Sequence, residues 1–201
     1  MTFPTLQSDG APVYAGAEPG RIQFRDLRGS PLFECQRTRI ENTKGEAMHI
    51  KLISVGKLKK GPEKELVDDY VSRFNKSGPN IGLRSLKLVD LASGGGREAE
   101  GKAILNAVPA GAKVLRLDEH GPALTSVEFS QQIAALRDAV TSECCVLMGG
   151  AEGYSEPVRE SFPQTLALGP QTWPHRLVKA MITEQLYRAV SLLAGLPYHK
   201  A

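Results

Sequence analysis

Three short stretches combine apolar residues with glycine or proline at places where a ligand could bind. They read LRLDEHGP (115–122), LMGGAEG (147–153) and LALGPQTWP (166–174), and each continues an apolar, strand-like run. In open α/β sheets, ligands bind beyond the carboxyl ends of the strands, and glycine lets backbone approach a ligand without an intervening Cβ. One such stretch alone can equally be a turn between a strand and a helix. Three together favour a shared cleft, into which a side chain at Gly149 would project.

A fourth glycine-bearing stretch, GKLKKG (56–61), resembles a phosphate loop only superficially. It lacks the GxxxxGK[ST] pattern, so nucleotide hydrolysis is not indicated. Its residues Lys57, Lys59 and Lys60 are either a solvated basic edge or contacts to RNA phosphates. Both interpretations stay open at this point.

The histidines and serines indicate neither a metal centre nor a hydrolase. His120, His175 and His199 do not have metal-ligand spacing, and no G-x-S-x-G nucleophile motif occurs. We therefore expect no metal.

An amphipathic stretch, Pro174–Ala194, follows the third candidate stretch directly. Pro174 suits the first position of a helix, because the N–H that proline lacks would be unpaired there anyway. Apolar residues then recur at helical spacing and predict a core face or a dimer interface. They are Val178, Ile182, Leu186, Val190 and Leu193, joined by Leu177 and Met181.

Polar residues of this stretch and of the chain terminus could also carry chemistry. Glu184 and Arg188 stand at i and i+4, where they form either a surface salt bridge or part of a site. The closing residues Tyr198, His199 and Lys200 put an aromatic ring, an imidazole and a cation together. Such a terminus is either frayed or closes over an RNA base by stacking and charge.

Alternating strand and helix patterns must position these residues. From Met48 onward this alternation predicts an α/β fold with a mainly parallel sheet flanked by helices. The predicted strands are 49–55, 85–91, 113–118, 144–148 and 165–169. The predicted helices are Gly61–Lys76, Arg97–Ala107, Ser126–Val140, a short piece after Ser155, and Pro174–Ala194.

The composition is that of a globular protein with a slight positive charge. The chain has 201 residues, of which 41% are hydrophobic and 23% charged, and its net charge of +3 is compatible with a nucleic-acid partner. No apolar run is long enough to span a bilayer, and no secretory signal is recognisable. Cys35, Cys144 and Cys145 make no disulfide framework. We expect a cytoplasmic protein with reduced thiols and no membrane contact.

Residues 1–47 differ from the rest of the chain. They carry scattered proline and glycine without sustained periodicity, and six basic residues balance six acidic ones. That many acids argue against a transit peptide. The segment is either a disordered N-terminal extension or sequence upstream of the true start at Met48. We expect it to be dispensable, and residues 48–201 to form the functional domain.

Residues 48–201 resemble the ribosomal large subunit methyltransferase H family, which belongs to the SPOUT superfamily of knotted methyltransferases. The resemblance rests on IKLISVGKLK near Met48, LMGGAEG in the middle, WPHRLVKAMITEQLYRA and the closing YHK, in this order. It implies a C-terminal trefoil knot in the α/β sheet, an obligate homodimer and S-adenosylmethionine (SAM) as cofactor. The cofactor-binding residues implied by position are Leu117, Gly149, Leu168, Gly169, Pro170, Gln171, Thr172 and Trp173.

The implied cofactor suits the third stretch physically. Adenine is flat and uncharged, so it is best held by apolar walls and backbone hydrogen bonds. A loop stiffened by Pro170 and Pro174 offers its amides and carbonyls with little ordering entropy left to lose.

The resemblance also implies the reaction, which is methyl transfer to N3 of pseudouridine-1915 in 23S rRNA on assembled ribosomes. The N3 proton must be accepted by some group, and His175 and Glu184 are candidates by their chemistry. The segment LDEHGP (117–122) departs from the family's form, which leaves the roles of Glu119 and His120 open. The implied RNA contacts are Arg188, Tyr198, His199 and Lys200.

Two other functions remain open from the sequence. One is a non-catalytic ribosome-binding or assembly factor that keeps the knot, and cofactor binding would distinguish it from an enzyme. The other is a SPOUT methyltransferase acting on tRNA, although the small size leaves little room for a tRNA-binding domain. We further expect a composite active site, in which the tail of one protomer reaches the cofactor loops of its partner.

Overall fold

The structure is a computed structural model that describes residues 21–25, 31–36 and 47–199. The chain divides into two compact units, Met1–Thr43 and Lys44–Ala201. In the first unit, strands β1 (Arg21–Arg25) and β2 (Pro31–Gln36) pair antiparallel. The sequence pattern predicts no strand in this segment. Most of residues 1–47 lie outside the described residues, so the expectation for this segment as a whole stays a prediction.

The second unit is built on a five-stranded sheet in which every pair of neighbouring strands is parallel. The strand order is β4-β3-β6-β5-β7. The apolar runs of the central strands are buried, as a parallel sheet covered on both faces requires; Ile50, Leu52 and Ile53 are fully inaccessible. The strands are β3 (Met48–Val55), β4 (Leu83–Leu91), β5 (Lys113–Leu117), β6 (Glu143–Met148) and β7 (Thr165–Leu166).

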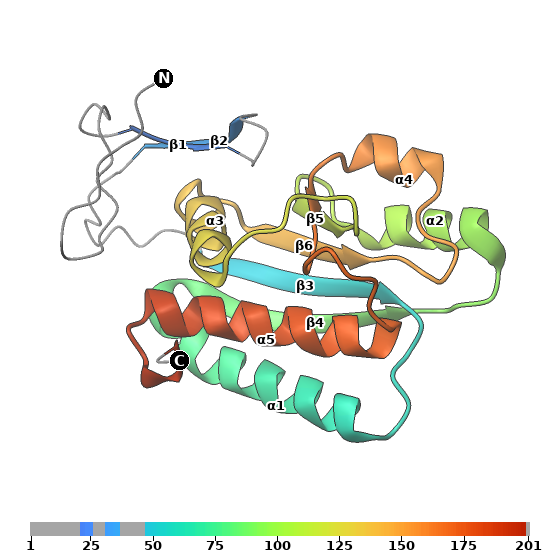
Figure 1. The fold of residues 1–201 in the computed structure, drawn as a ribbon, viewed down its shortest axis with the longest axis horizontal. Coiled ribbons are helices and arrows are strands. Elements are labelled where there is room, and N and C mark those ends of the chain that lie inside the picture. The colour runs from blue at the N-terminus through green and yellow to red at the C-terminus, as the bar shows by residue number, and fades with distance from the viewer. Residues whose placement is uncertain (1–20, 26–30, 37–46, 200–201) are drawn as a thin grey trace. The chain divides into compact units, whose positions relative to one another are not determined.

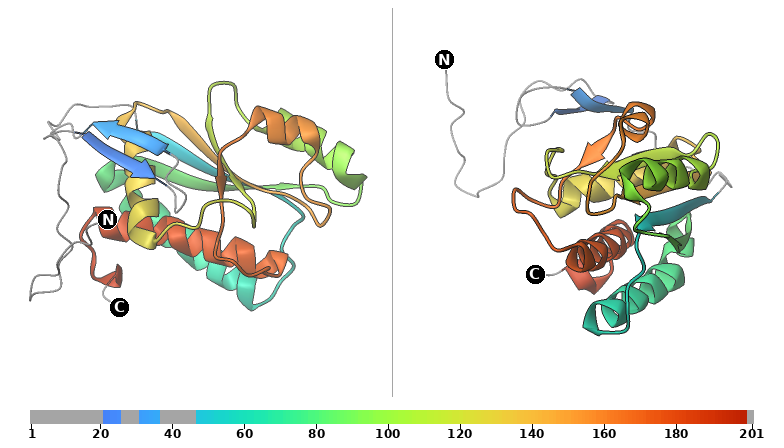
Figure 2. Two further views of the ribbon diagram at one scale, coloured as in Figure 1. Left: turned by 45° about the horizontal axis from the view of Figure 1, so that its top comes forward. Right: turned by 90° about the vertical axis from the view of Figure 1, so that its right-hand side faces the viewer.

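Helices cover both faces of the sheet, as Figures 1 and 2 show. Helices α1, α3 and α5 lie on one face, where α5 packs between the other two. Helices α2 and α4 cover the other face. The helices are α1 (Pro62–Ser77), α2 (Gly96–Ala107), α3 (Ser126–Asp138), α4 (Glu156–Ser161) and α5 (His175–Leu193), with short 3₁₀ turns η1 (Gly78–Ile81) and η2 (Pro197–His199).

Local sequence explains where these helices begin. Helix α3 starts after a capping box, in which the Thr125 side chain accepts from the Glu128 N–H and the Glu128 carboxylate accepts from the Thr125 N–H. Helix α1 starts at Pro62, which fits the first helical position. Pro174 is the N-cap of α5, so the helix starts one residue later than the sequence predicts.

The predicted α/β fold is confirmed, with boundaries that agree within a few residues for nearly every element. The exception is the last strand, predicted over 165–169, which ends at Leu166. Beyond it, Ala167 forms only an isolated bridge with Ala123, and Gly169 turns the chain with a positive φ of 109°. The strand is short because the chain leaves the sheet here.

The chain after β7 has to cross the sheet edge. β7 lies beside β5 at the outer edge, yet His175 at the start of α5 contacts Val55, the last residue of β3. Because β6 and β5 stand between β3 and β7, residues 167–174 span the carboxyl ends of those two strands. This crossing places the third candidate stretch over the ends of the first two.

Candidate active site

The three candidate stretches lie at one edge of the sheet, as predicted. β5, β6 and β7 are parallel, so the residues that follow their carboxyl ends gather at that edge. The first and third stretches are in contact. The Ala167 N–H donates to the Pro122 carbonyl over 2.9 Å, and the Thr172 hydroxyl donates to Glu119 Oε2 over 3.0 Å. Glu119, whose role the sequence left open, therefore links the two stretches.

Protein atoms lie where side chains on the glycines of the second stretch would extend. A Cβ on Gly149 would lie 3.2 Å from two ring atoms of Tyr154. A Cβ on Gly150 would lie inside contact distance of Glu100 Oε2 and 3.0 Å from Glu100 Cδ. Both missing side chains leave room for protein atoms. A ligand can still use the backbone polar groups of this stretch.

Tyr154 belongs to a buried cluster beneath the first stretch. Its hydroxyl donates to the Leu147 carbonyl over 2.8 Å, and burial raises the pKa of this phenol. The guanidinium of Arg116 lies 4.9 Å from the ring centroid and donates to Asp118 Oδ2 over 2.6 Å. This cluster holds Arg116, near the end of β5, between Tyr154 and Asp118.

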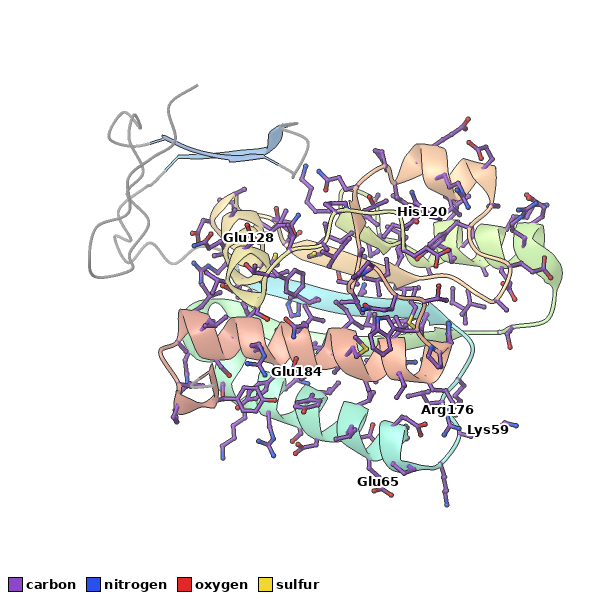
Figure 3. The ribbon with its side chains drawn as sticks, viewed as in Figure 1. Lys59, Glu65, His120, Glu128, Arg176 and Glu184 are labelled. Atoms are coloured by element: carbon purple, nitrogen blue, oxygen red, sulfur yellow. The ribbon has the colours of Figure 1, made fainter. Side chains whose placement is uncertain are left out.

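Asp118 is the acidic group that fixes the first stretch. Burial alone would raise its pKa, but the His120 N–H and the Arg116 guanidinium outweigh burial and hold the pKa below its usual value. Asp118 is therefore a charged, structural carboxylate. The His120 side chain is 86% exposed, so the residue contributes mainly through its backbone N–H. Figure 3 labels His120 on this loop.

Glu100 of α2 is a buried polar residue that the sequence reading missed. It is 8% exposed, and its Oε1 accepts from the Gly94 N–H over 3.0 Å. Its other oxygen faces Gly150. Glu100 thus connects the β4–α2 loop with the second stretch. The only sequence feature that could have indicated a buried Glu100 was its position in a helix that must bury one face.

The first turn of α5 is fixed to the carboxyl ends of β3 and β4. His175 Nε2 lies 2.8 Å from the Val55 carbonyl. A carbonyl can only accept, so Nε2 carries the proton and Nδ1 keeps the lone pair. Burial lowers the pKa of His175 and outweighs the hydrogen bond to the Val55 carbonyl, which raises it, so the neutral imidazole is favoured near pH 7. A neutral imidazole with a lone pair can accept a proton.

Lys179 is the second buried polar residue that the sequence did not reveal. It is only 1% exposed, donates to Ser54 Oγ over 2.8 Å and forms an ion pair with Asp90. The signal was a lysine one turn after His175, within the amphipathic stretch. The ion pair fixes α5 against the sheet directly behind the third stretch.

A polar cluster surrounds Glu184 in the second half of α5. Glu184 Oε1 accepts from Arg188 Nε over 2.8 Å and from the Tyr198 hydroxyl over 3.1 Å. The Tyr198 hydroxyl also lies 3.3 Å from that of Tyr70, and burial raises the pKa of Tyr198. The predicted i, i+4 pair is thus formed and ties the chain terminus to α5. The side chain of His199 and all of Lys200 lie outside the described residues.

An apolar pocket of about 600 Å³ lies beside Glu184 and the start of the third stretch. It is lined by α3, α5, the start of the third stretch and two residues of α1, Leu66 and Tyr70. Of the eight expected cofactor residues, only Leu168 and Gly169 line it. His175 and Glu184 are nine residues apart, or about 13 Å along the helix, so one small substrate atom cannot meet both in one chain.

Comparison with known proteins shows to which protein family this chain belongs. The family model described as "Predicted SPOUT methyltransferase" matches residues 48–199. The chain belongs to the SPOUT methyltransferase family. The match covers the whole sheet, the three candidate stretches and α5 of this methyltransferase.

Two curated relatives of the SPOUT methyltransferase are both named "Ribosomal RNA large subunit methyltransferase H". The protein from Hyphomonas neptunium is 50% identical over 154 residues, which cover 77% of this chain and 100% of the relative. The protein from Dinoroseobacter shibae is 41% identical over 155 residues, covering 76% and 99%. Among solved structures, SpoU methyltransferase AviRb from Streptomyces viridochromogenes, in complex with AdoMet, has a TM-score of 0.36 at 12% identity, covering 81% of this chain and 68% of that chain.

No helix in the described part of the methyltransferase has the length and apolar character needed to cross a membrane. No group of three potential metal ligands gathers among the described residues.

Proposed function

We propose that this chain transfers a methyl group from SAM to N3 of pseudouridine-1915 in 23S rRNA on assembled ribosomes. The observation that carries the proposal is the 50% identity to a relative named ribosomal RNA large subunit methyltransferase H, over that relative's whole length. The chain's own site residues support it, as follows.

The cofactor would be held by the eight residues named from the sequence. Residues 168–173 carry no charged side chain, and those from Pro170 onward are exposed, which suits an uncharged adenine and backbone hydrogen bonds. Leu117 and Gly149 lie at the ends of the neighbouring strands β5 and β6. When bound, SAM supplies an electrophilic methyl carbon. The protein then has to orient the acceptor nitrogen against that carbon.

His175 is the better candidate for the proton acceptor on the cofactor side. It is neutral, it directly follows residues 168–174, and its Nδ1 keeps a lone pair while Nε2 is held by Val55. Glu184 already accepts hydrogen bonds from Arg188, Gln185 and Tyr198. We therefore assign Glu184 to the RNA side, where it orients Arg188 and Tyr198, with His199 and Lys200 adjoining.

The separation of these two groups supports a homodimer with composite active sites. Within one chain, the first turn of α5 and the Glu184 cluster are too far apart to act on one base. Leu66 and Leu177 are 47% and 39% exposed beside the apolar pocket, which suits an interface between two copies. A second copy could then bring its Tyr198 cluster to the cofactor loops.

The same proposal includes a trefoil knot, formed where residues 167–174 pass the loops that follow β5 and β6. The contacts of Ala167 with Pro122 and of Thr172 with Glu119 support a tight passage. It also includes a cytoplasmic location, where ribosomes are found, and a dispensable segment 1–47. The family match from residue 48 supports the last point.

One experiment tests the function. Ribosomes from cells that lack the protein are incubated with purified protein and SAM, and the rRNA nucleosides are analysed by mass spectrometry. We expect one methyl group on one pseudouridine of large-subunit RNA. If no methyl group is transferred and calorimetry shows no SAM binding, a non-catalytic assembly factor is supported instead. Methylation of added tRNA alone would move the substrate to tRNA.

A further inference from the structure

The β3–α1 loop, residues 56–61, presents three lysines to solvent. Lys57, Lys59 and Lys60 are all exposed, and the loop contains no acidic residue. Long, solvated cations of this kind contribute little to folding stability. Their concentration in six residues therefore calls for a role other than packing.

The loop backbone that carries these lysines is held at several points. The Gly56 N–H donates to the Leu91 carbonyl over 2.9 Å, and Leu58 is 6% exposed because it packs against Val67 and Ala180. At the other end, the Gly61 carbonyl accepts from the first turn of α1. The alternation of buried Leu58 with exposed lysines points the charges outward from a fixed loop. A preorganised loop loses little entropy when it binds a partner.

The loop stands beside the candidate active site. It begins one residue after Val55, which contacts His175, and a Cβ on Gly61 would lie 3.0 Å from Arg176 Nη2. His175 and Arg176 directly follow the proposed cofactor segment. Figure 3 shows Lys59 and Arg176 extending from the same end of the molecule. The lysines therefore lie beside the proposed cofactor segment.

The charge of this surface is positive after its carboxylates are considered. Arg176 pairs with Glu63 over 2.7 Å, and Lys64 pairs with Asp68. Glu65 is the remaining acid in the first turn of α1, as Figure 3 shows. Three lysines against one unmatched carboxylate leave a local net charge of about +2, in a chain with a total net charge of +3.

We propose that Lys57, Lys59 and Lys60 form a phosphate-binding surface for the rRNA backbone next to the methylated base. The proposal rests on the proposed function. Lysine ammonium groups contact phosphates as point charges, release counterions and do not read sequence. The surface therefore adds affinity and orientation for RNA. It takes no part in methyl transfer or in SAM binding.

The test compares two triple variants of the full chain with equal loss of charge. The test variant is Lys57→Gln/Lys59→Gln/Lys60→Gln. The control variant is Lys76→Gln/Arg84→Gln/Lys113→Gln, whose residues are exposed at the opposite, amino-terminal end of the strands. Methyl transfer to ribosomes and binding of a large-subunit RNA stem-loop are measured between 50 and 200 mM salt.

We expect the test variant to lower the slope of log affinity against log salt by about 2, since each phosphate contact in single-stranded RNA contributes about 0.7. Over this fourfold salt range, wild-type affinity would then fall roughly 16-fold more than that of the variant. The KM for ribosomes rises, whereas the SAM affinity and kcat at saturating ribosomes stay unchanged. The control variant should keep the wild-type slope.

Two results would overturn this assignment. One is an unchanged slope and KM in the test variant, and the other is an equal change in the control variant. Both presuppose an active wild-type protein. If the wild type itself neither binds rRNA nor methylates it, the proposed function fails, and that outcome differs from a failure of the lysine surface alone.

Discussion

Lys179→Met is expected to destabilise the protein strongly, although it replaces a long side chain by another of similar length. The ammonium group is 1% exposed, donates to Ser54 and pairs with Asp90, whose side chain is 27% exposed. The substitution removes the charge and both donated hydrogen bonds. It leaves the Asp90 carboxylate, which water reaches in part, without its cation.

Removing one partner of a buried ion pair typically costs about 3–5 kcal/mol. Water reaches part of Asp90, so we expect the lower end, about 3 kcal/mol. In a chain of this size, 1 kcal/mol corresponds to about 2–4 °C in Tm. The melting temperature should therefore fall by roughly 6–12 °C.

The assay is urea unfolding followed by circular dichroism, at one fixed protein concentration because dimerisation contributes to stability. Lys64→Met is the matched control, since Lys64 also pairs with an aspartate but is 36% exposed on α1. Its loss should cost at most about 0.5 kcal/mol. Asp90→Asn and the double variant complete a cycle that should give a coupling of about 1–3 kcal/mol.

The reasoning is refuted if Lys179→Met costs no more than Lys64→Met. It is also refuted if the effects of Lys179→Met and Asp90→Asn are simply additive. In either case, the ion pair would not be what holds α5 to the sheet.

Three further predictions follow from the site. Gly150→Ala should cost about 1–3 kcal/mol of unfolding free energy by overpacking, but little in a Glu100→Ala background; equal losses in both backgrounds would contradict the packing role of Gly150. Because burial lowers the pKa of His175, kcat should be constant near pH 7 and fall only at a pH below 6.5, as the imidazole becomes protonated. If His175→Gln shows the same fall of kcat at low pH, His175 is not the base. Gly169→Val strains a backbone with a positive φ of 109° and should disable the cofactor loop. Mixed dimers that pair this variant with Tyr198→Ala/His199→Ala should recover up to about half of the wild-type activity per dimer. The composite site is refuted if these heterodimers are inactive while each variant stays active when paired with wild type.

The secondary structure could be predicted from the sequence because its determinants are local. The apolar run at 49–55 and the stripe from Val178 to Leu193 have the periods of a buried strand and an amphipathic helix, and both elements form. Parallel strands also had to bring the three candidate stretches to one edge. The edge could therefore be identified before any distance was known.

The roles of individual polar residues could not be predicted, because they depend on partners far away in the sequence. Lys179 meets Ser54 across 125 positions, and Glu100 faces a glycine fifty positions later. Sequence pattern assigns a lysine or a glutamate to a solvated helix face by default. Nothing near Gly150 in the sequence indicates that Glu100 lies beside it.

The attachment of α5 to the start of the sheet has a consequence for synthesis on the ribosome. Ser54 leaves the exit tunnel 125 residues before Lys179, a delay of about 6–25 s at ordinary rates of translation. From its own synthesis until Lys179 is added, 89 residues later, Asp90 lacks this cation, and residues 167–174 are absent for most of that time. A nascent or prematurely ended chain therefore cannot build the site. The last quarter of the chain completes the fold and makes it competent to bind a ligand at the same moment.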